Sequence, residues 1–252
     1  MPRYDFRTPR LFLERQPIEA GQSLELSRAQ ANYLVNVLRL TKAEPVLVFN
    51  GRDGEWRASI RSDRKSVLLD VLQQIRPQTA AGDLEYLFAP LKHGRLDYMV
   101  QKAVEMGASR LIPVLTRHTQ TRRVNLERMR ANAIEAAEQC GILNLPEIAE
   151  PATLEELVAG WTPTRLLVFC DEDAETADPV AALSPARSGG LMGALPVSLL
   201  IGPEGGFAEE ERKALARLPN VIRLALGPRI LRADTAAVAA LALIQAVLGD
   251  WR

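Results

Sequence analysis

Cysteine and histidine are scarce in this chain, which has two of each among 252 residues. His93 and His118 lie far apart and lack the cysteine or carboxylate spacing of a zinc site, so we expect no bound metal. Cys140 and Cys170 each lie among apolar residues, which favours buried thiols in a reducing compartment. The scarcity of cysteine therefore excludes a disulfide-stabilised scaffold.

Long apolar runs are also missing. The longest uncharged stretch near the C-terminus, Thr235 to Gly249, is shorter than the roughly 20 apolar residues that span a bilayer. The segment from Met1 to Arg15 contains arginines and acids where a signal peptide has an apolar centre. We therefore expect a soluble, cytoplasmic protein without a membrane partner.

Several common enzyme motifs are absent as well. The chain has no G-x-G-x-x-G after a predicted strand, no P-loop sequence and no G-x-S-x-G. These absences argue against a Rossmann dinucleotide enzyme, a P-loop nucleotidase and a serine hydrolase. With 47% hydrophobic and 25% charged residues, the composition is that of a globular protein of one large or two modest domains.

A formal net charge of zero hides an uneven distribution of charge. Residues 1–76 carry 13 basic and 9 acidic side chains, whereas residues 77–252 carry 18 and 22. Arg110 to Arg130 contains six arginines opposed only by Glu127. Such clusters suit a polyphosphate such as RNA, because neutralised phosphates dominate the affinity for nucleic acid. A solvated charged face is the alternative explanation for either cluster.

The first 76 residues predict a small β-barrel with one helix. Short strand-like segments alternate with turn residues. Between them, Ser27 to Leu40 places apolar residues on one helical face behind a serine N-cap. The predicted strands are Ser23 to Leu26, Val46 to Phe49, Glu55 to Ile60 and Ser66 to Leu72. Arg76 to Asp83 is the predicted linker to a second domain, residues 84–252.

After the linker, strands and helices alternate, which predicts a three-layer α/β domain with its ligand site at the C-terminal ends of parallel strands. The final helix, Thr235 to Leu248, is apolar almost all round, so it needs cover from the core or from a second subunit. The predicted strands are Leu84 to Ala89, Leu111 to Leu115, Leu166 to Cys170, Val197 to Ile201 and Val221 to Leu226. The other predicted helices are Leu96 to Met106, Asn125 to Cys140 and a short helix whose first turn holds Glu209, Glu210 and Glu211.

Two glycine-containing loops each follow a predicted buried strand. The first is Ile201 to Phe207, and the second runs from Leu226 to the helix start at Thr235. Glycine permits positive φ and close approach of a ligand to the backbone. Either loop alone could be a structural turn, but two loops at one sheet edge can line a pocket for an adenine-like group.

Four segments of the chain, in the same order, resemble motifs of the RsmE family of small-subunit rRNA methyltransferases. They are Leu91 to Gly107, Glu135 to Cys140, Ile201 to Phe207 and Gly227 to Ala236, and the similarity runs from Arg10 to the C-terminus. The resemblance implies a PUA-like N-terminal β-barrel, a C-terminal SPOUT domain with a trefoil knot, S-adenosylmethionine (SAM) as methyl donor, and a homodimer. It further implies methylation of N3 of a uridine in 16S rRNA of the small ribosomal subunit.

The resemblance and the loops together predict the functional residues. Arg232 could stabilise negative charge on a uracil oxygen, while Glu204 or Asp234 could accept the N3 proton. Turn hydrogen bonding and helix capping are alternative roles for these two carboxylates. The predicted cofactor-binding residues are Ile201, Gly202, Pro203, Glu204, Gly205, Gly206, Leu226, Gly227, Ile230, Leu231, Thr235 and Ala236. The predicted RNA-binding residues are Arg10, Arg39, Arg117, Arg122 and Arg123.

The chain departs from the family pattern at three places. The family commonly has Glu at the position of Asp234, an Arg soon after its Glu-Gln motif where this chain has Gly141-Ile142, and His near Asn32. Asp234 keeps the charge, whereas the missing arginine removes one expected RNA or active-site contact. Two other functions stay open from the sequence: a non-enzymatic rRNA-binding assembly factor, and a tRNA methyltransferase of the same fold.

Overall fold

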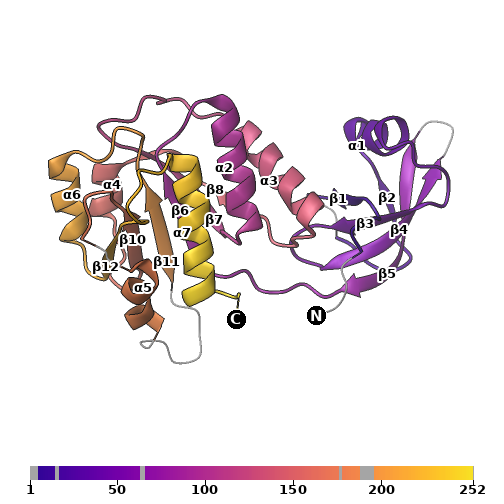
Figure 1. Cartoon of the computed structure of the whole chain (residues 1–252). Coiled ribbons are helices and arrows are strands. Elements are labelled where there is room, and N and C mark those ends of the chain that lie inside the picture. Colours follow the sequence, from indigo (N-terminus) through magenta and orange to yellow (C-terminus); the bar gives the residue numbers. More distant parts are fainter. Residues whose placement is uncertain (1–4, 15–16, 63–65, 176–177, 188–195, 252) are drawn as a thin grey trace. The chain divides into compact units, whose positions relative to one another are not determined.

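The computed structural model describes residues 5–14, 17–62, 66–175, 178–187 and 196–251 (Figure 1). The chain divides into two compact units: Met1–Ala80 with Ile134–Leu145, and Ala81–Ala133 with Pro146–Arg252. The first boundary falls inside the predicted linker. In contrast, residues 134–145 were expected in the C-terminal domain and belong to the N-terminal unit. No helix in the described ranges is long and apolar enough to cross a membrane.

The N-terminal unit is built on a five-stranded sheet in the order β1-β3-β4-β5-β2. Its strands are β1 (Arg10–Phe12), β2 (Ser23–Glu25), β3 (Pro45–Phe49), β4 (Glu55–Ser62) and β5 (Val67–Arg76). Strands β3, β4 and β5 form an antiparallel meander, and β1 pairs parallel with β3. Leucine, isoleucine and valine side chains from all five strands share one buried cluster, as expected for strands with one apolar face.

The helix predicted for Ser27 to Leu40 changes its form partway along. Helix α1 (Arg28–Asn32) begins with a capping box in which the Ser27 side chain accepts the Gln30 N–H, so the predicted N-cap is confirmed. The chain continues as a π-helix, η1 (Tyr33–Val37), and Leu38 N–H donates to the Tyr33 carbonyl at 2.9 Å. Arg39 follows with φ of 56° and an exposed side chain.

Arg10 is buried, so its predicted contact with RNA is wrong. Its Nε donates to Glu55 Oε1 at 2.8 Å, and the two side chains are only 3% and 2% exposed. Nη2 of Arg10 donates to the Asp5 carbonyl at 2.7 Å, while Arg76 Nε donates to the other oxygen of Glu55 at 2.7 Å. Breaking such a buried pair typically costs about 3–5 kcal/mol, because one charge is left uncompensated.

Helix α3 (Leu126–Cys140) supplies residues to both units. In its second half, Glu138 Oε1 accepts the Phe12 N–H at 2.8 Å, and beyond its end the Gly141 carbonyl accepts Arg76 Nη2 at 2.8 Å. These bonds join residues 134–145 to the N-terminal sheet. Cys140 is exposed, so the expectation of a buried thiol is wrong at this position.

The C-terminal unit contains a seven-stranded sheet in the order β12-β10-β11-β6-β7-β8, with β9 paired to β7. Every pairing in this sheet is parallel, which confirms the predicted parallel sheet. The strands are β6 (Leu84–Phe88), β7 (Arg110–Leu115), β8 (Glu147–Ile148), β9 (Ala152–Thr153), β10 (Leu166–Cys170), β11 (Val197–Ile201) and β12 (Val221–Leu224). The apolar runs of β6, β7, β10 and β11 are buried almost completely, whereas β8, β9 and β12 are only partly buried.

Helices cover both faces of this sheet and complete three layers (Figure 1). On one face α7 packs against α2, α5 and β11, and on the other α4 packs against α6 and β7. The helices are α2 (His93–Glu105), α4 (Leu154–Ala159), α5 (Pro179–Arg187), α6 (Glu209–Ala216) and α7 (Ala233–Val247). The predicted three-layer arrangement is therefore confirmed, whereas the trefoil knot stays a prediction.

Glu138 leads to a prediction about pH and stability. Burial raises the pKa of its carboxyl from 4.5 to about 7. Between these values the folded protein binds more protons than the unfolded chain, so the free energy of unfolding falls as the pH rises from about 4.5 to 7. Glu138→Gln keeps an acceptor for Phe12 and removes the charge. We expect it to stabilise the protein near pH 8 by up to about 3 kcal/mol in urea unfolding.

The same variant should match the wild type near pH 4, where the carboxyl is protonated. Glu150→Gln, which removes an exposed carboxyl, is the matched control and should leave the pH dependence of stability unchanged. If Glu138→Gln shows the wild-type pH dependence, then Glu138 is not the group responsible.

Candidate functional site

A cavity of about 420 Å³ lies at the C-terminal ends of three parallel strands. We call it the strand-end cavity. Its walls are the segments that follow β10, β11 and β12, together with the first turn of α7. The lining residues are Cys170, Asp171, Glu172, residues 201–207, residues 224–231, Ala233 and Ala236. The cavity therefore lies at the sheet edge where the sequence placed the ligand site.

All but one of the predicted cofactor-binding residues line the strand-end cavity. The exception is Thr235, which lines a separate hollow of about 500 Å³ between α2 and α7, the α2–α7 groove. The groove is lined by Gly94, Arg95, Tyr98, Asp234, Thr235, Val238 and Ala239. Ala233 and Ala236 occupy the face of α7 that the cavity meets, so Thr235 lies off that face, and its contact with the cofactor stays a prediction.

Three glycines of the cavity are required by the shape of their loops. A Cβ on Gly202 would lie 2.9 Å from the Phe207 ring, and a Cβ on Gly206 would lie 2.6 Å from Glu172 Oε1. Gly206 and Gly227 also have φ values of 66° and 95°, which side-chain-bearing residues rarely adopt. A side chain at any of these three positions would therefore crowd or strain the strand-end loops.

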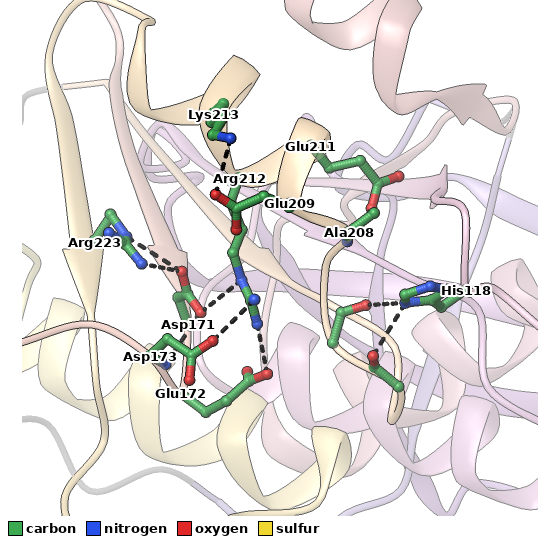
Figure 2. A network of polar contacts seen from close by, with 12 residues as sticks. His118, Asp171, Glu172, Asp173, Ala208, Glu209, Glu211, Arg212, Lys213 and Arg223 are labelled. Carbon is green, nitrogen blue, oxygen red and sulfur yellow. Dashed lines mark hydrogen bonds and ion pairs between the residues drawn. The ribbon is translucent and has the colours of Figure 1, made fainter.

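An arginine network that the sequence patterns did not predict holds the wall after β10 (Figure 2). Arg212 on α6 forms ion pairs with Asp171, Glu172 and Asp173 at 3.2, 2.8 and 2.9 Å. Arg223 on β12 pairs with the fully buried Asp171 carboxylate at 2.6 Å. The three carboxylates lie close enough together to hold a metal ion, but each is already paired with Arg212. The acids were visible in the sequence directly after a predicted strand, whereas their arginine partners were not.

The turn after β7 holds the loop that follows β11 from another side (Figure 2). Glu211 is 8% exposed; its Oε1 accepts the Arg117 N–H at 2.7 Å and its Oε2 accepts the Ala208 N–H at 2.8 Å. Nδ1 of His118 lies 3.1 Å from the carbonyl oxygens of both Gly205 and Gly206. Loop 202–207 is therefore bonded to a segment that comes from a different strand.

The two predicted catalytic residues differ in their relation to the cavity. Glu204 lies in the cavity wall, and its exposed carboxylate pairs with Arg95 of α2 at 3.3 Å. Arg232 is the N-cap residue of α7 and does not line the cavity. Its guanidinium is 59% exposed and lies 3.6 Å from Asp234. Exposed ion pairs contribute little free energy, so a substrate can replace either partner.

Cys170 lines the cavity without being a reactive thiol. Burial raises the pKa of Cys170 to about 12, and the neighbouring Asp171 charge acts in the same direction. The thiol is therefore protonated at neutral pH and is no nucleophile.

The predicted RNA-binding arginines other than Arg10 are exposed. They are Arg39 in the N-terminal unit, and Arg117, Arg122 and Arg123 in the C-terminal unit. Arg117 lies 3.4 Å from Glu210, with the two side chains 68% and 77% exposed, so this pair does not prevent a phosphate contact.

Comparison with known proteins gives matches over nearly the whole chain. Residues 78–245 match the model of an RNA methyltransferase domain, and residues 26–72 match that of an RNA methyltransferase PUA domain. The chain is 29% identical to ribosomal RNA small subunit methyltransferase E of Rickettsia conorii over 94% of each chain. It is 33% identical to the protein of the same name from Synechocystis over 92% of this chain and 75% of that protein.

Solved structures confirm the fold. A protein from Legionella pneumophila, solved in complex with the bound cofactor SAM, has a TM-score of 0.79 and 30% identity over 95% of this chain and 98% of that chain. A ribosomal RNA small subunit methyltransferase E from Neisseria gonorrhoeae has a TM-score of 0.83 at 22% identity over 98% of this chain and 100% of that chain, and shows the same fold. The mixed α/β architecture of the SPOUT type, with a PUA-like N-terminal domain, is thereby established. The chain belongs to the ribosomal RNA small subunit methyltransferase E (RsmE) family of RNA methyltransferases.

Proposed function

We propose that this protein transfers a methyl group from SAM to N3 of a uridine in 16S rRNA of the small ribosomal subunit, in the cytoplasm. The observation that carries this proposal is the strand-end cavity, whose two glycine loops are the segments that resemble RsmE motifs. The Rickettsia and Synechocystis relatives are ribosomal RNA small subunit methyltransferases, and the Legionella structure contains SAM. These similarities support the same cofactor and substrate class here.

The strand-end cavity fits SAM in size and chemistry. Its volume lies within the range of about 300–1,000 Å³ that is typical of small-molecule sites. Apolar side chains such as Ile201 and Leu231 line it beside glycine backbone. The carboxylate of Glu204, whose ion pair with Arg95 is exposed, suits a ligand that carries positive charge. When bound, SAM supplies an electrophilic methyl group.

In the proposed reaction the protein prepares the uracil and positions the RNA. Uridine N3 carries a proton that must leave, and the Glu204 carboxylate accepts it. The Arg232 guanidinium stabilises the negative charge that then develops on a uracil oxygen. Arg39, Arg117, Arg122 and Arg123 contact flanking phosphates, and the target base is unstacked before it reaches the site.

Methyl transfer to purified small ribosomal subunits from cells that lack the protein tests this function. With labelled SAM, we expect label in 16S rRNA, recovered as 3-methyluridine by mass spectrometry. Label in tRNA alone would favour the tRNA methyltransferase. RNA binding without SAM binding up to millimolar concentration in calorimetry would favour the non-enzymatic assembly factor.

A matched pair of glycine variants tests the cofactor site. Gly227 and Gly21 both have positive φ, and in the described part of the chain no atom beyond the adjacent residues lies within 4 Å of a Cβ added to either. Of the two, Gly227 lines the strand-end cavity and Gly21 does not. Valine should therefore impose similar backbone strain at both positions. We expect Gly227→Val to weaken SAM binding in calorimetry at least about tenfold and Gly21→Val to leave it unchanged. Equal SAM affinity in the two folded variants would place the cofactor elsewhere.

Arg232→Ala tests the proposed charge stabilisation. Because the uracil charge exists only during the reaction, we expect the single-turnover rate at saturating RNA and SAM to fall by about 100-fold or more, with both affinities retained. Arg217→Ala, which removes another exposed arginine of this unit, should retain the rate. Weaker RNA binding with an unchanged rate would instead make Arg232 an RNA-positioning residue.

We also propose a homodimer with α7 at or beside the interface, so that both subunits complete the pockets. Helix α7 consists mostly of alanine, leucine, valine and isoleucine. Beside it, Tyr98 of the α2–α7 groove is 43% exposed. Light scattering at micromolar concentration should give twice the 27.8 kDa mass of one chain. A monomer mass would contradict the proposal.

A further inference from the structure

His118 contacts the cavity loop but takes no part in the proposed chemistry. Its Nδ1 lies 3.1 Å from the Gly205 carbonyl oxygen and 3.1 Å from that of Gly206 (Figure 2). Both oxygens are acceptors, so a hydrogen bond to either requires that Nδ1 carries the proton and donates it. The imidazole comes from the turn after β7, whereas the glycines follow β11, so the contact joins separate parts of the chain.

The turn that carries His118 is itself held in place. Thr116 and Thr119 are buried, and the Thr116 N–H donates to Thr119 Oγ1 at 2.9 Å. Arg117, which precedes His118, donates its N–H to one carboxylate oxygen of the buried Glu211. The other oxygen of Glu211 accepts the Ala208 N–H. His118 is therefore presented from a support that is bonded to the far end of the same glycine loop.

The glycine loop needs such support at Gly205 and Gly206. Glycine has the widest choice of backbone conformations, so two in succession make an ordered loop entropically costly. The Gly206 N–H donates to the Pro203 carbonyl at 2.9 Å, which closes a turn on the cavity side. The carbonyls of Gly205 and Gly206 receive the His118 ring. Bonds that hold a loop in its binding conformation raise affinity, because the ligand no longer has to order it.

We propose that His118 is a positioning residue that holds loop 202–207 in the conformation that binds the cofactor. This inference rests on the proposed function for the identity of the ligand. His118 does not line the strand-end cavity. Its loss therefore lowers the fraction of molecules whose loop is in the binding conformation, and leaves the rate of methyl transfer with SAM bound unchanged. The expected effect is weaker SAM binding with an unchanged rate of methyl transfer at saturating SAM.

Three substitutions separate the hydrogen bond from the bulk of the side chain. Asn can place an amide N–H near the position of Nδ1, whereas Asp has the same shape but only acceptor oxygens, and Ala removes the group. We expect His118→Asp and His118→Ala to raise the Kd for SAM about tenfold, as for the loss of one or two hydrogen bonds, and His118→Asn to stay within about threefold. Because His118 is exposed, all three variants should unfold near the wild-type temperature.

Hydrogen exchange in the protein without SAM tests the positioning role separately from the cofactor. We expect faster exchange of the amides of residues 204–208 in the Asp and Ala variants, and wild-type exchange in the Asn variant. Unchanged exchange in His118→Asp, or equal behaviour of the Asn and Ala variants, overturns the inference. If exchange rises as expected while the wild type itself does not bind SAM, the positioning role stands and the proposed function fails.

Discussion

The parallel pairing of β10 with β11 and with β12 is the constraint on which the strand-end cavity depends. The register places Cys170 beside both Ile201 and Leu224, so three strands end at one level. The loops that leave these ends are far apart in sequence, yet they start side by side. A shift of one strand by a single residue would turn its side chains to the opposite face of the sheet. The burial of β10 and β11, and of Leu224 at the end of β12, therefore fixes the position of the cavity walls as well as the core.

The glycine loops have few side chains of their own to fix the cavity walls, and helix α6 provides the side-chain contacts that do so. Glu211 and Arg212 are neighbours on this helix and serve different segments. The Glu211 carboxylate binds backbone N–H groups of Arg117 and Ala208, while the Arg212 guanidinium binds the acids that follow β10. Because α6 begins directly after the loop from β11, a short piece of chain fastens two walls of the cavity.

Local patterns were enough to predict nine of the twelve strands in the described residues, most helices and the two glycine loops, because alternation, apolar runs and glycine act over a few residues. The short strands β1, β8 and β9 were not predicted. Long-range partners were beyond their reach. Arg10 looked like a surface cation, and only Glu55, 45 residues away, explains its burial. The periodicity of α3 predicted a helix but not which unit would cover its second half. Nor did the loop pattern show that Thr235 lies off the cavity: a helix turns by about 100° per residue, which puts Ala233 and Ala236 on the cavity side.

Only some of the arginines in the two basic segments are accessible to an RNA partner. In the N-terminal unit Arg10 and Arg76 form ion pairs with Glu55, and Arg61 forms one with Asp70. Part of the positive charge of this unit is therefore neutralised within the fold. In the arginine-rich segment, Arg128 pairs with Asp97 and Arg110 with Glu85. Arg117, Arg122 and Arg123 stay exposed between these two. Residues 116–123 therefore contain both the accessible arginines and the histidine that contacts the cavity loop. The position of this segment is set by the buried end of β7 and by the hydrogen bond from the Arg117 N–H to Glu211.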